Sequence, residues 1–245
     1  MPQKETSVTD LITIDGKRGT GKTAVAKGLS TLFACDVFEL GPLFRFFAWR
    51  LVSEPLHDTA SLANEIRNDV ALGRLQMRMN PKAEMSNNEL IYNGQVIYQQ
   101  LWNRELDERI SIIASDPQVV DCVCHCAAML IASRRAIVVG REAGSRCFPS
   151  AALKIELLAS YKTRISRKVG QLSGFSARDE DMAGIDLPEP MTSQSRSPET
   201  LSIDTTTLGP LEVLERIASL ISNRLGWRRI TSDTLLSGDA DSHDC

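Results

Sequence analysis

The sequence lacks the features that mark several large classes of protein. Its formal net charge is −3 and it has no run of basic residues, so we expect no general affinity for nucleic acid or for an anionic membrane. No apolar run approaches the length of a membrane span or of the apolar region of a signal peptide. We therefore expect a cytoplasmic protein that holds any anion, as a small-molecule ligand, at a local site.

The cysteine spacing argues against a secreted domain built on a disulfide framework. The run CVCHC, residues 122–126, would place Cys122 and Cys126 on one face of a helix and Cys124 nearly opposite. Three thiols that cannot converge favour core packing over a metal site. The six cysteines, which show no framework spacing and which we expect to be reduced thiols, stand at positions 35, 122, 124, 126, 147 and 245.

Apolar, β-branched runs alternate along the chain with longer amphipathic segments. This alternation predicts an α/β fold with a parallel sheet. Apolar residues on both sides of Asn93-Gly94 predict a β-hairpin with a type I′ turn. The predicted strands cover residues 11–15, 35–40, 136–139, 153–159 and 201–205, and the predicted helices cover residues 22–33, 42–54, 59–72, 104–115, 117–135, 160–172 and 210–225.

The length of the chain sets the expected number of domains. With 245 residues it can bury a substantial core, and we expect a single domain over residues 10–229. The hairpin would belong to an insert of about residues 58–115. We expect the polar residues 1–9 and the Ser- and Asp-rich residues 230–245 to be disordered.

The segment GKRGTGKT, residues 16–23, fits the phosphate-loop pattern G-x-x-x-x-G-K-[ST] between a predicted strand and a predicted helix. Its glycines allow backbone N–H groups to point at a phosphate, and the helix N-terminus favours an anion. Lys22 would reach the β- and γ-phosphates and Thr23 would bind Mg²⁺. ATP is favoured over GTP because no N-K-x-D segment occurs. The predicted ATP-binding residues are Gly16, Lys17, Arg18, Gly19, Thr20, Gly21, Lys22, Thr23 and Ala24.

Five collinear segments carry a resemblance to a known family. They are ITIDGKRGTGKT, ELGPLFR, IVVGREAGSRCFPSA, KIELLAS and IDTTTL, and together they span most of residues 11–225. The chain resembles the cytidylate kinase family of P-loop nucleoside monophosphate kinases. The resemblance implies a three-layer P-loop kinase fold, an inserted acceptor-binding subdomain, a lid over about residues 173–200, and Mg·ATP as phosphoryl donor.

The resemblance also implies roles for four arginines. Arg164 and Arg167 lie three residues apart on one predicted helix face, in register with arginines that meet the ATP phosphates. Arg45 and Arg141 align with arginines that hold the phosphate of the acceptor. The predicted catalytic residues are Lys22, Glu142 and three of these arginines, Arg141, Arg164 and Arg167.

Departures from the family pattern concentrate on the acceptor side. Leu40 stands where the family has a serine that contacts cytosine, and a leucine cannot hydrogen-bond a base. The lid segment, residues 174–200, holds six acidic residues and only two arginines, Arg178 and Arg196. We therefore expect a small-molecule kinase whose acceptor specificity is shifted away from CMP. The predicted acceptor-binding residues are Glu39, Leu40, Arg45, Trp102, Arg104, Arg141 and Arg178.

Two other functions and several roles stay open at this point. The chain could phosphorylate CMP or dCMP through a diverged pocket, or bind ATP as a regulatory protein without catalysis. Retention of the phosphate-loop lysine and of the arginines argues against the regulatory protein. Glu142 or Glu39 could act as a base, orient Mg²⁺-bound water, or form an ion pair. Asp36 and Asp204 could help to place Mg²⁺ or could cap local turns.

Overall fold

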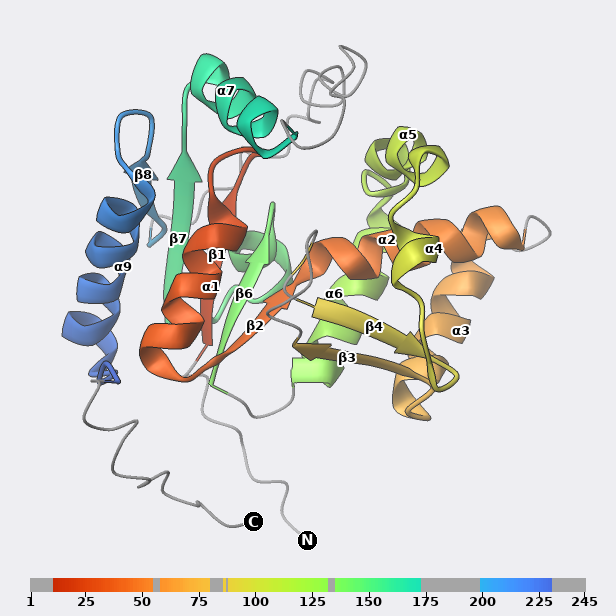
Figure 1. The fold of residues 1–245 in the computed structure, drawn as a ribbon. Helices are drawn as coiled ribbons and strands as arrows, with labels where there is room; N and C mark the ends of the chain where they lie inside the picture. Colours follow the sequence, from red (N-terminus) through yellow and green to blue (C-terminus); the bar gives the residue numbers. More distant parts are fainter. Residues whose placement is uncertain are drawn as a thin grey trace, which may run out of the picture.

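A five-stranded parallel sheet forms the centre of the protein (Figure 1). The computed structural model describes residues 11–54, 58–79, 86, 88–131, 135–172 and 199–230. The strand order is β2-β6-β1-β7-β8, which confirms the predicted parallel α/β architecture. These strands are β1 (Leu11–Gly16), β2 (Asp36–Glu39), β6 (Ala136–Gly140), β7 (Leu153–Leu158) and β8 (Leu201–Asp204).

Side-chain alternation along the strands separates two helical layers. Ile12 and Ile14 of β1 point to one face, where they share a core with helices α1 (Lys22–Phe33) and α9 (Pro210–Leu225). The other face packs Phe38 and Val138 against α2 (Leu40–Ser53) and α6 (Pro117–Ile131). Figure 1 shows α1 and α9 on one side of the sheet and α2 and α6 on the other. The predicted three layers are thus confirmed.

The insert forms its own small sheet beside this domain. The predicted turn at Asn93-Gly94 is present, with both residues at positive φ of 50° and 78°. Strand β3, which is antiparallel to β4, was missed because methionine-rich LQMRM has little of the β-branched character that marks strands. The insert contains α3 (Thr59–Ala71), β3 (Leu75–Met79), β4 (Asn88–Tyr92), β5 (Gln95–Val96), α4 (Tyr98–Leu101) and α5 (Arg104–Ile113).

Local capping explains where α3 begins. Asp58 precedes the helix, and its Oδ1 accepts hydrogen bonds from the backbone N–H groups of Ala60 and Ser61, both at 2.9 Å. These bonds satisfy donors that have no partner inside the helix. They also lower the pKa of the Asp58 carboxyl, with the Ser61 N–H as the main cause.

Some expected features fall outside the described residues. These are residues 1–9, the tail from residue 231, and the lid apart from Glu199 and Thr200, so Arg178 and Arg196 are also outside. Within the described ranges, none of the helices combines the length and the apolar character needed to span a bilayer.

Candidate functional site

The loop between β1 and α1 has the conformation that the glycine pattern predicts. Gly16, Gly19 and Gly21 all have positive φ, at 147°, 83° and 96°, a region that other residues rarely adopt. A Cβ atom on Gly19 would lie 2.8 Å from the carbonyl oxygen of Arg164 and 2.9 Å from its Cβ. Glycine is therefore required here both by the turn and by the close approach of the loop to helix α7 (Tyr161–Leu172).

Lys22 begins α1 and reaches back over the loop. Its Nζ donates to the carbonyl oxygens of Gly16 at 2.6 Å and of Lys17 at 2.9 Å. Thr23 follows at an exposed position on the first turn of the helix. The ammonium and the hydroxyl therefore lie at the loop, where the sequence predicts donor phosphates and a metal ion.

The structure brings the two arginines of α7 to this same loop. Arg164 is buried, and its Nη1 donates to the carbonyl oxygen of Arg18 at 3.3 Å. Arg167 donates from Nη1 to the carbonyl oxygen of Thr20 at 3.4 Å and from Nη2 to that of Thr205 at 2.6 Å. Three cationic side chains thus converge on one stretch of glycine-rich backbone.

Arg164 keeps an unused donor in this position. Its Nε is buried and has no hydrogen-bond partner among the described residues. A buried guanidinium N–H without an acceptor is costly and is well suited to an anion. The donor set therefore fits the triphosphate that the sequence predicts.

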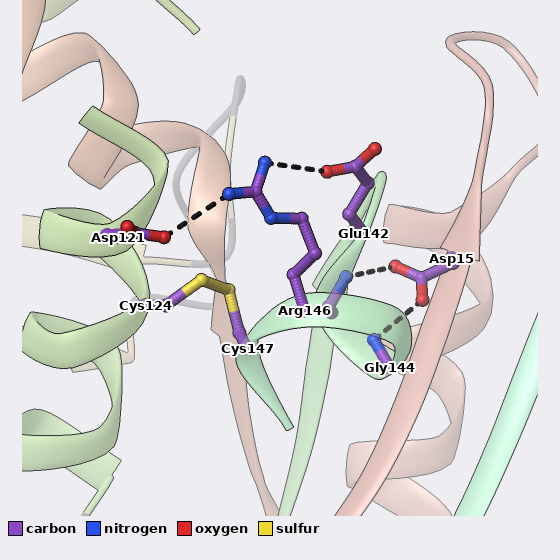
Figure 2. The surroundings of a disulfide bond; sticks show 8 residues. Asp15, Asp121, Cys124, Glu142, Gly144, Arg146 and Cys147 are labelled. Carbon is purple, nitrogen blue, oxygen red and sulfur yellow. Dashed lines mark hydrogen bonds and ion pairs between the residues drawn. A yellow bond between two sulfur atoms is a disulfide. The ribbon is translucent and has the colours of Figure 1, made fainter. Parts of the chain in front are cut away.

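The turn that follows β6 carries Arg141 and Glu142. Arg141 is exposed, while Glu142 is half-buried and leads into the π-helical turn η2 (Ala143–Cys147). Glu142 Oε2 lies 3.6 Å from Arg146 Nη1, and Arg146 Nη2 lies 3.2 Å from Asp121 Oδ1 on α6 (Figure 2). Arg146 was missed because its pairing with Glu142 needs a helical turn that was not predicted here, and its other partner, Asp121, lies on a separate helix.

Asp15, at the end of β1, connects the phosphate loop to this turn. Its Oδ1 accepts the N–H of Ala143 at 2.7 Å, and its Oδ2 accepts the N–H of Gly144 at 2.8 Å (Figure 2). Burial raises the pKa of the Asp15 carboxyl, and the two N–H donors and the charge of Lys22 only partly oppose this effect. Asp15 could not be predicted as a site residue from sequence patterns, because its two partners lie more than a hundred residues away.

Arg45 and Trp102, both predicted to bind the acceptor, lie against each other. Arg45 is buried on α2 and donates to the Leu101 carbonyl oxygen at 2.9 Å and to the carboxylate of Asp107. Its guanidinium carbon lies 4.1 Å from the centroid of the Trp102 ring. Asp107 is an additional residue of this cluster that sequence reasoning missed. Arg104 begins α5, and its side chain lies outside the described part of the chain.

Glu39 and Leu40 lie where β2 passes into α2. Glu39 is buried, and its Oε2 accepts the Ser86 hydroxyl at 2.7 Å. Asn88 of β4 bonds to the backbone of β2. Its Oδ1 accepts the N–H of Glu39 at 2.7 Å, and its Nδ2 donates to the carbonyl oxygen of Val37 at 2.6 Å. These bonds connect the main sheet to the insert, while base catalysis by Glu39 stays a prediction.

Leu40 packs against Gly140, the residue that precedes Arg141. It is buried, and a Cβ atom on Gly140 would lie 2.9 Å from its Cδ1. Leu40 and Arg141, both predicted to bind the acceptor, therefore lie on neighbouring segments.

The expectation of six reduced thiols is wrong for two cysteines. Cys124 of α6 and Cys147 of η2 form a disulfide, with their Cα atoms 4.6 Å apart (Figure 2). The helix does separate Cys124 from Cys122 and Cys126, which are buried and free. The face of Cys124 meets η2, and this contact depends on tertiary packing that cysteine spacing does not reveal.

The two other candidate carboxylates behave differently. Asp36 begins β2 and therefore lies at the amino-terminal ends of the parallel strands, away from the phosphate loop. The expectation that Asp36 ends a strand is wrong. Asp204 does end β8, and its Oδ1 accepts the hydroxyl of Thr206 at 2.5 Å and the N–H of Thr206 at 2.8 Å. The hydroxyl is the main cause of the lowered Asp204 pKa, and the bonds show local turn capping.

Comparisons with known proteins agree along nearly the whole chain. The model of the family described as cytidylate kinase matches residues 12–223. The cytidylate kinase of Shouchella clausii is 25% identical over 221 residues, which cover 86% of this chain and 95% of that protein. That of Shewanella denitrificans is 27% identical over 218 residues, covering 85% and 94%. That of Geobacillus kaustophilus is 24% identical over 226 residues, covering 88% and 97%.

The raised pKa of Asp15 predicts an unusual dependence of stability on pH. The folded protein binds this proton more tightly than the unfolded chain, whose aspartate pKa is 3.8. The contribution of Asp15 to the free energy of unfolding is therefore complete below pH 3.8 and is lost as pH rises through the raised pKa. In urea unfolding at a series of pH values, the difference between wild type and Asp15→Asn should decrease above pH 3.8.

Asp58→Asn provides a control of opposite sign. Because the pKa of Asp58 is lowered from 3.8, its contribution is lost as pH falls through the lowered value and is complete above 3.8. The difference between wild type and Asp58→Asn should therefore increase with pH in the acid range. A flat Asp15 profile would contradict the assignment of a desolvated carboxylate.

Proposed function

This chain belongs to the cytidylate kinase family and is a phosphotransferase, and from this premise we propose that it transfers the γ-phosphoryl group of Mg·ATP to CMP or dCMP. The observation that carries the proposal is the convergence of Lys22, Arg164 and Arg167 on a loop of positive-φ glycines. Phosphoryl transfer needs mainly positioning and charge neutralisation, and these groups supply both.

The donor side is proposed to use the whole loop, from Gly16 to Ala24. The Lys22 ammonium now binds two neutral carbonyl oxygens, and a phosphate oxygen is a stronger, charged partner for it. The unpaired Nε of Arg164 supplies a further donor. The Thr23 hydroxyl would ligate Mg²⁺, which neutralises charge on the β- and γ-phosphates.

The acceptor side is proposed to use Arg45 and Arg141 for the phosphate of CMP. A nucleoside monophosphate is largely doubly ionised near neutral pH, so its attacking oxygen needs no base. Under this proposal neither Glu142 nor Glu39 acts as a base. Glu142 forms an ion pair with Arg146 that helps to hold the turn. Glu39 links β2 to the insert.

The insert and the lid are proposed to complete the binding site for the acceptor. The insert, about residues 58–115, packs Leu75 and Leu90 into the same core as α2, so the acceptor arginine Arg45 and the insert are held by one apolar cluster. We propose that the domain spans residues 10–229 and that about residues 173–200 close over the substrates.

One observation favours a second candidate, a kinase whose acceptor is smaller or more apolar than CMP. Leu40 is buried next to Gly140 and cannot hydrogen-bond a base, and the guanidinium of Arg45 covers the ring of Trp102. The match to the cytidylate kinase family along the chain supports CMP as the first candidate.

A panel of acceptors separates the two candidates. ADP release with Mg·ATP should be measured for CMP, dCMP, UMP, AMP and a set of non-nucleotide phosphates and alcohols. CMP and dCMP are expected to exceed every other acceptor in kcat/KM by about 10-fold or more, because a base site discriminates through paired polar groups. Turnover confined to a non-nucleotide would instead select the second candidate.

Leu40→Ser tests the position of the base pocket. A serine hydroxyl beside Gly140 would restore one hydrogen bond to cytosine, and we expect kcat/KM for CMP to rise by about 10-fold, the value of one such bond. The kcat/KM for ATP should stay unchanged. An unchanged rate with CMP would show that the base does not lie against Leu40.

Lys22→Ala tests the phosphate loop itself. Loss of the ammonium should lower kcat by about 100-fold to 1,000-fold, as for the loss of one group that stabilises transition-state charge. The thermal melt should be unchanged, because Lys22 is only half-buried. Lys27→Ala, at an exposed position further along α1, is the matched control and should retain full activity. Full activity in Lys22→Ala would remove the loop from the mechanism.

A further inference from the structure

The short turn that presents Arg141 and Glu142 is fixed from two directions. On one side, both oxygens of the Asp15 carboxylate accept N–H groups of η2, from Ala143 at 2.7 Å and from Gly144 at 2.8 Å. Asp15 immediately precedes Gly16, the first glycine of the phosphate loop. A single buried carboxylate therefore connects the donor loop to the backbone of the acceptor turn.

The packing around this connection leaves little room for movement. A Cβ atom on Gly144 would lie 2.5 Å from the Thr13 hydroxyl oxygen and 3.2 Å from Asp15 Oδ2. Gly144 therefore lets the turn approach β1 closely enough for both N–H groups to reach the carboxylate. The bidentate geometry fixes the orientation of the turn as well as its distance from the strand.

On the other side, the turn is held to α6. The disulfide between Cys124 and Cys147 joins the carboxyl end of η2 to this helix. The ion pair between Arg146 and Asp121 also joins η2 to α6. Figure 2 shows these contacts on the α6 side of the turn and Asp15 on the opposite side. Arg141 and Glu142 directly precede the segment that lies between the two anchors.

We propose that Asp15 and the Cys124–Cys147 disulfide are positioning groups for the acceptor half of the reaction. Asp15 holds the beginning of η2 against the phosphate loop, and the disulfide holds its end against α6. Neither group touches a substrate in this scheme. Both act through the backbone that carries Arg141 and Glu142, and the inference rests on the proposed function of these two residues.

Asp15→Asn tests the first anchor. An amide oxygen can accept one N–H, but the amide NH₂ then faces the second N–H group, so one charge-assisted bond is lost. We expect kcat/KM for the acceptor to fall by about 10-fold to 100-fold, while KM for ATP changes by less than about 3-fold. Equal losses for ATP and acceptor would indicate general loosening of the protein and would overturn the positioning role.

Reduction tests the second anchor. A dithiol such as dithiothreitol breaks the S–S bond, leaving two cysteine thiols and the oxidised cyclic disulfide of the reagent, with two electrons transferred. Both cysteines are half-buried and can be reached. We expect a rise in acceptor KM of about 3-fold to 10-fold, reversed on reoxidation, with KM for ATP unchanged. An unchanged acceptor KM on complete reduction would overturn the role of the disulfide.

Two cysteine variants serve as controls for reduction. The double variant Cys124→Ser with Cys147→Ser should behave as the reduced wild type and should not respond to the dithiol. Cys35→Ser, which removes a buried thiol from the core on the other face of the sheet from Cys147, should keep the full response. A response to the dithiol in the double variant would place the effect at another cysteine and overturn the proposal.

Amide hydrogen exchange separates failure of this inference from failure of the proposed function. Exchange at residues 143–147 should accelerate in Asp15→Asn and on reduction, while exchange in β7 stays protected. This readout requires no turnover, so it remains informative if no acceptor in the panel is phosphorylated. Unchanged exchange in the turn under both conditions would overturn the proposal, whatever the kinetics show.

Discussion

The pair of hydrogen bonds from η2 to the Asp15 carboxylate is the constraint on which the site depends. β1 has its neighbours β6 and β7 on either side, and near its carboxyl end Asp15 bonds to the turn that follows β6. Placing a carboxylate there is costly, because it loses water and its pKa rises. The two N–H donors offset part of this cost, and the resulting geometry sets how the phosphate loop faces the turn proposed to bind the acceptor.

The donor half could be predicted from the sequence because its physics is local. A loop that binds phosphate through backbone N–H groups needs glycine at fixed spacings, and Gly16, Gly19 and Gly21 have the required positive φ. Strand, loop and helix follow one another directly, so periodicity and turn chemistry were sufficient. Arg164 and Arg167 were placed by helical spacing together with the family resemblance, and both do meet the loop.

The contacts around the residues proposed for the acceptor could be predicted less completely, because they join distant segments. Asp15 meets Ala143, Arg45 meets Asp107, and Cys124 meets Cys147, and each pairing exists only once the helices have packed. Cysteine spacing could exclude a disulfide framework but not a single bond between α6 and a turn that periodicity did not predict. Strand β3 was missed for another reason, since its methionines carry a weak strand signal.

The proposed mechanism requires donor and acceptor nucleotides to bind side by side, on either side of the contact between Asp15 and η2. The most direct test is calorimetric titration with a bisubstrate analogue, in which adenosine and cytidine are joined through their 5′ positions by a phosphate chain. Two adjacent sites predict a Kd at least about 100-fold lower than that of ADP, because the second end binds intramolecularly. An affinity equal to that of ADP would mean that cytidine finds no site beside the loop, and would contradict the account.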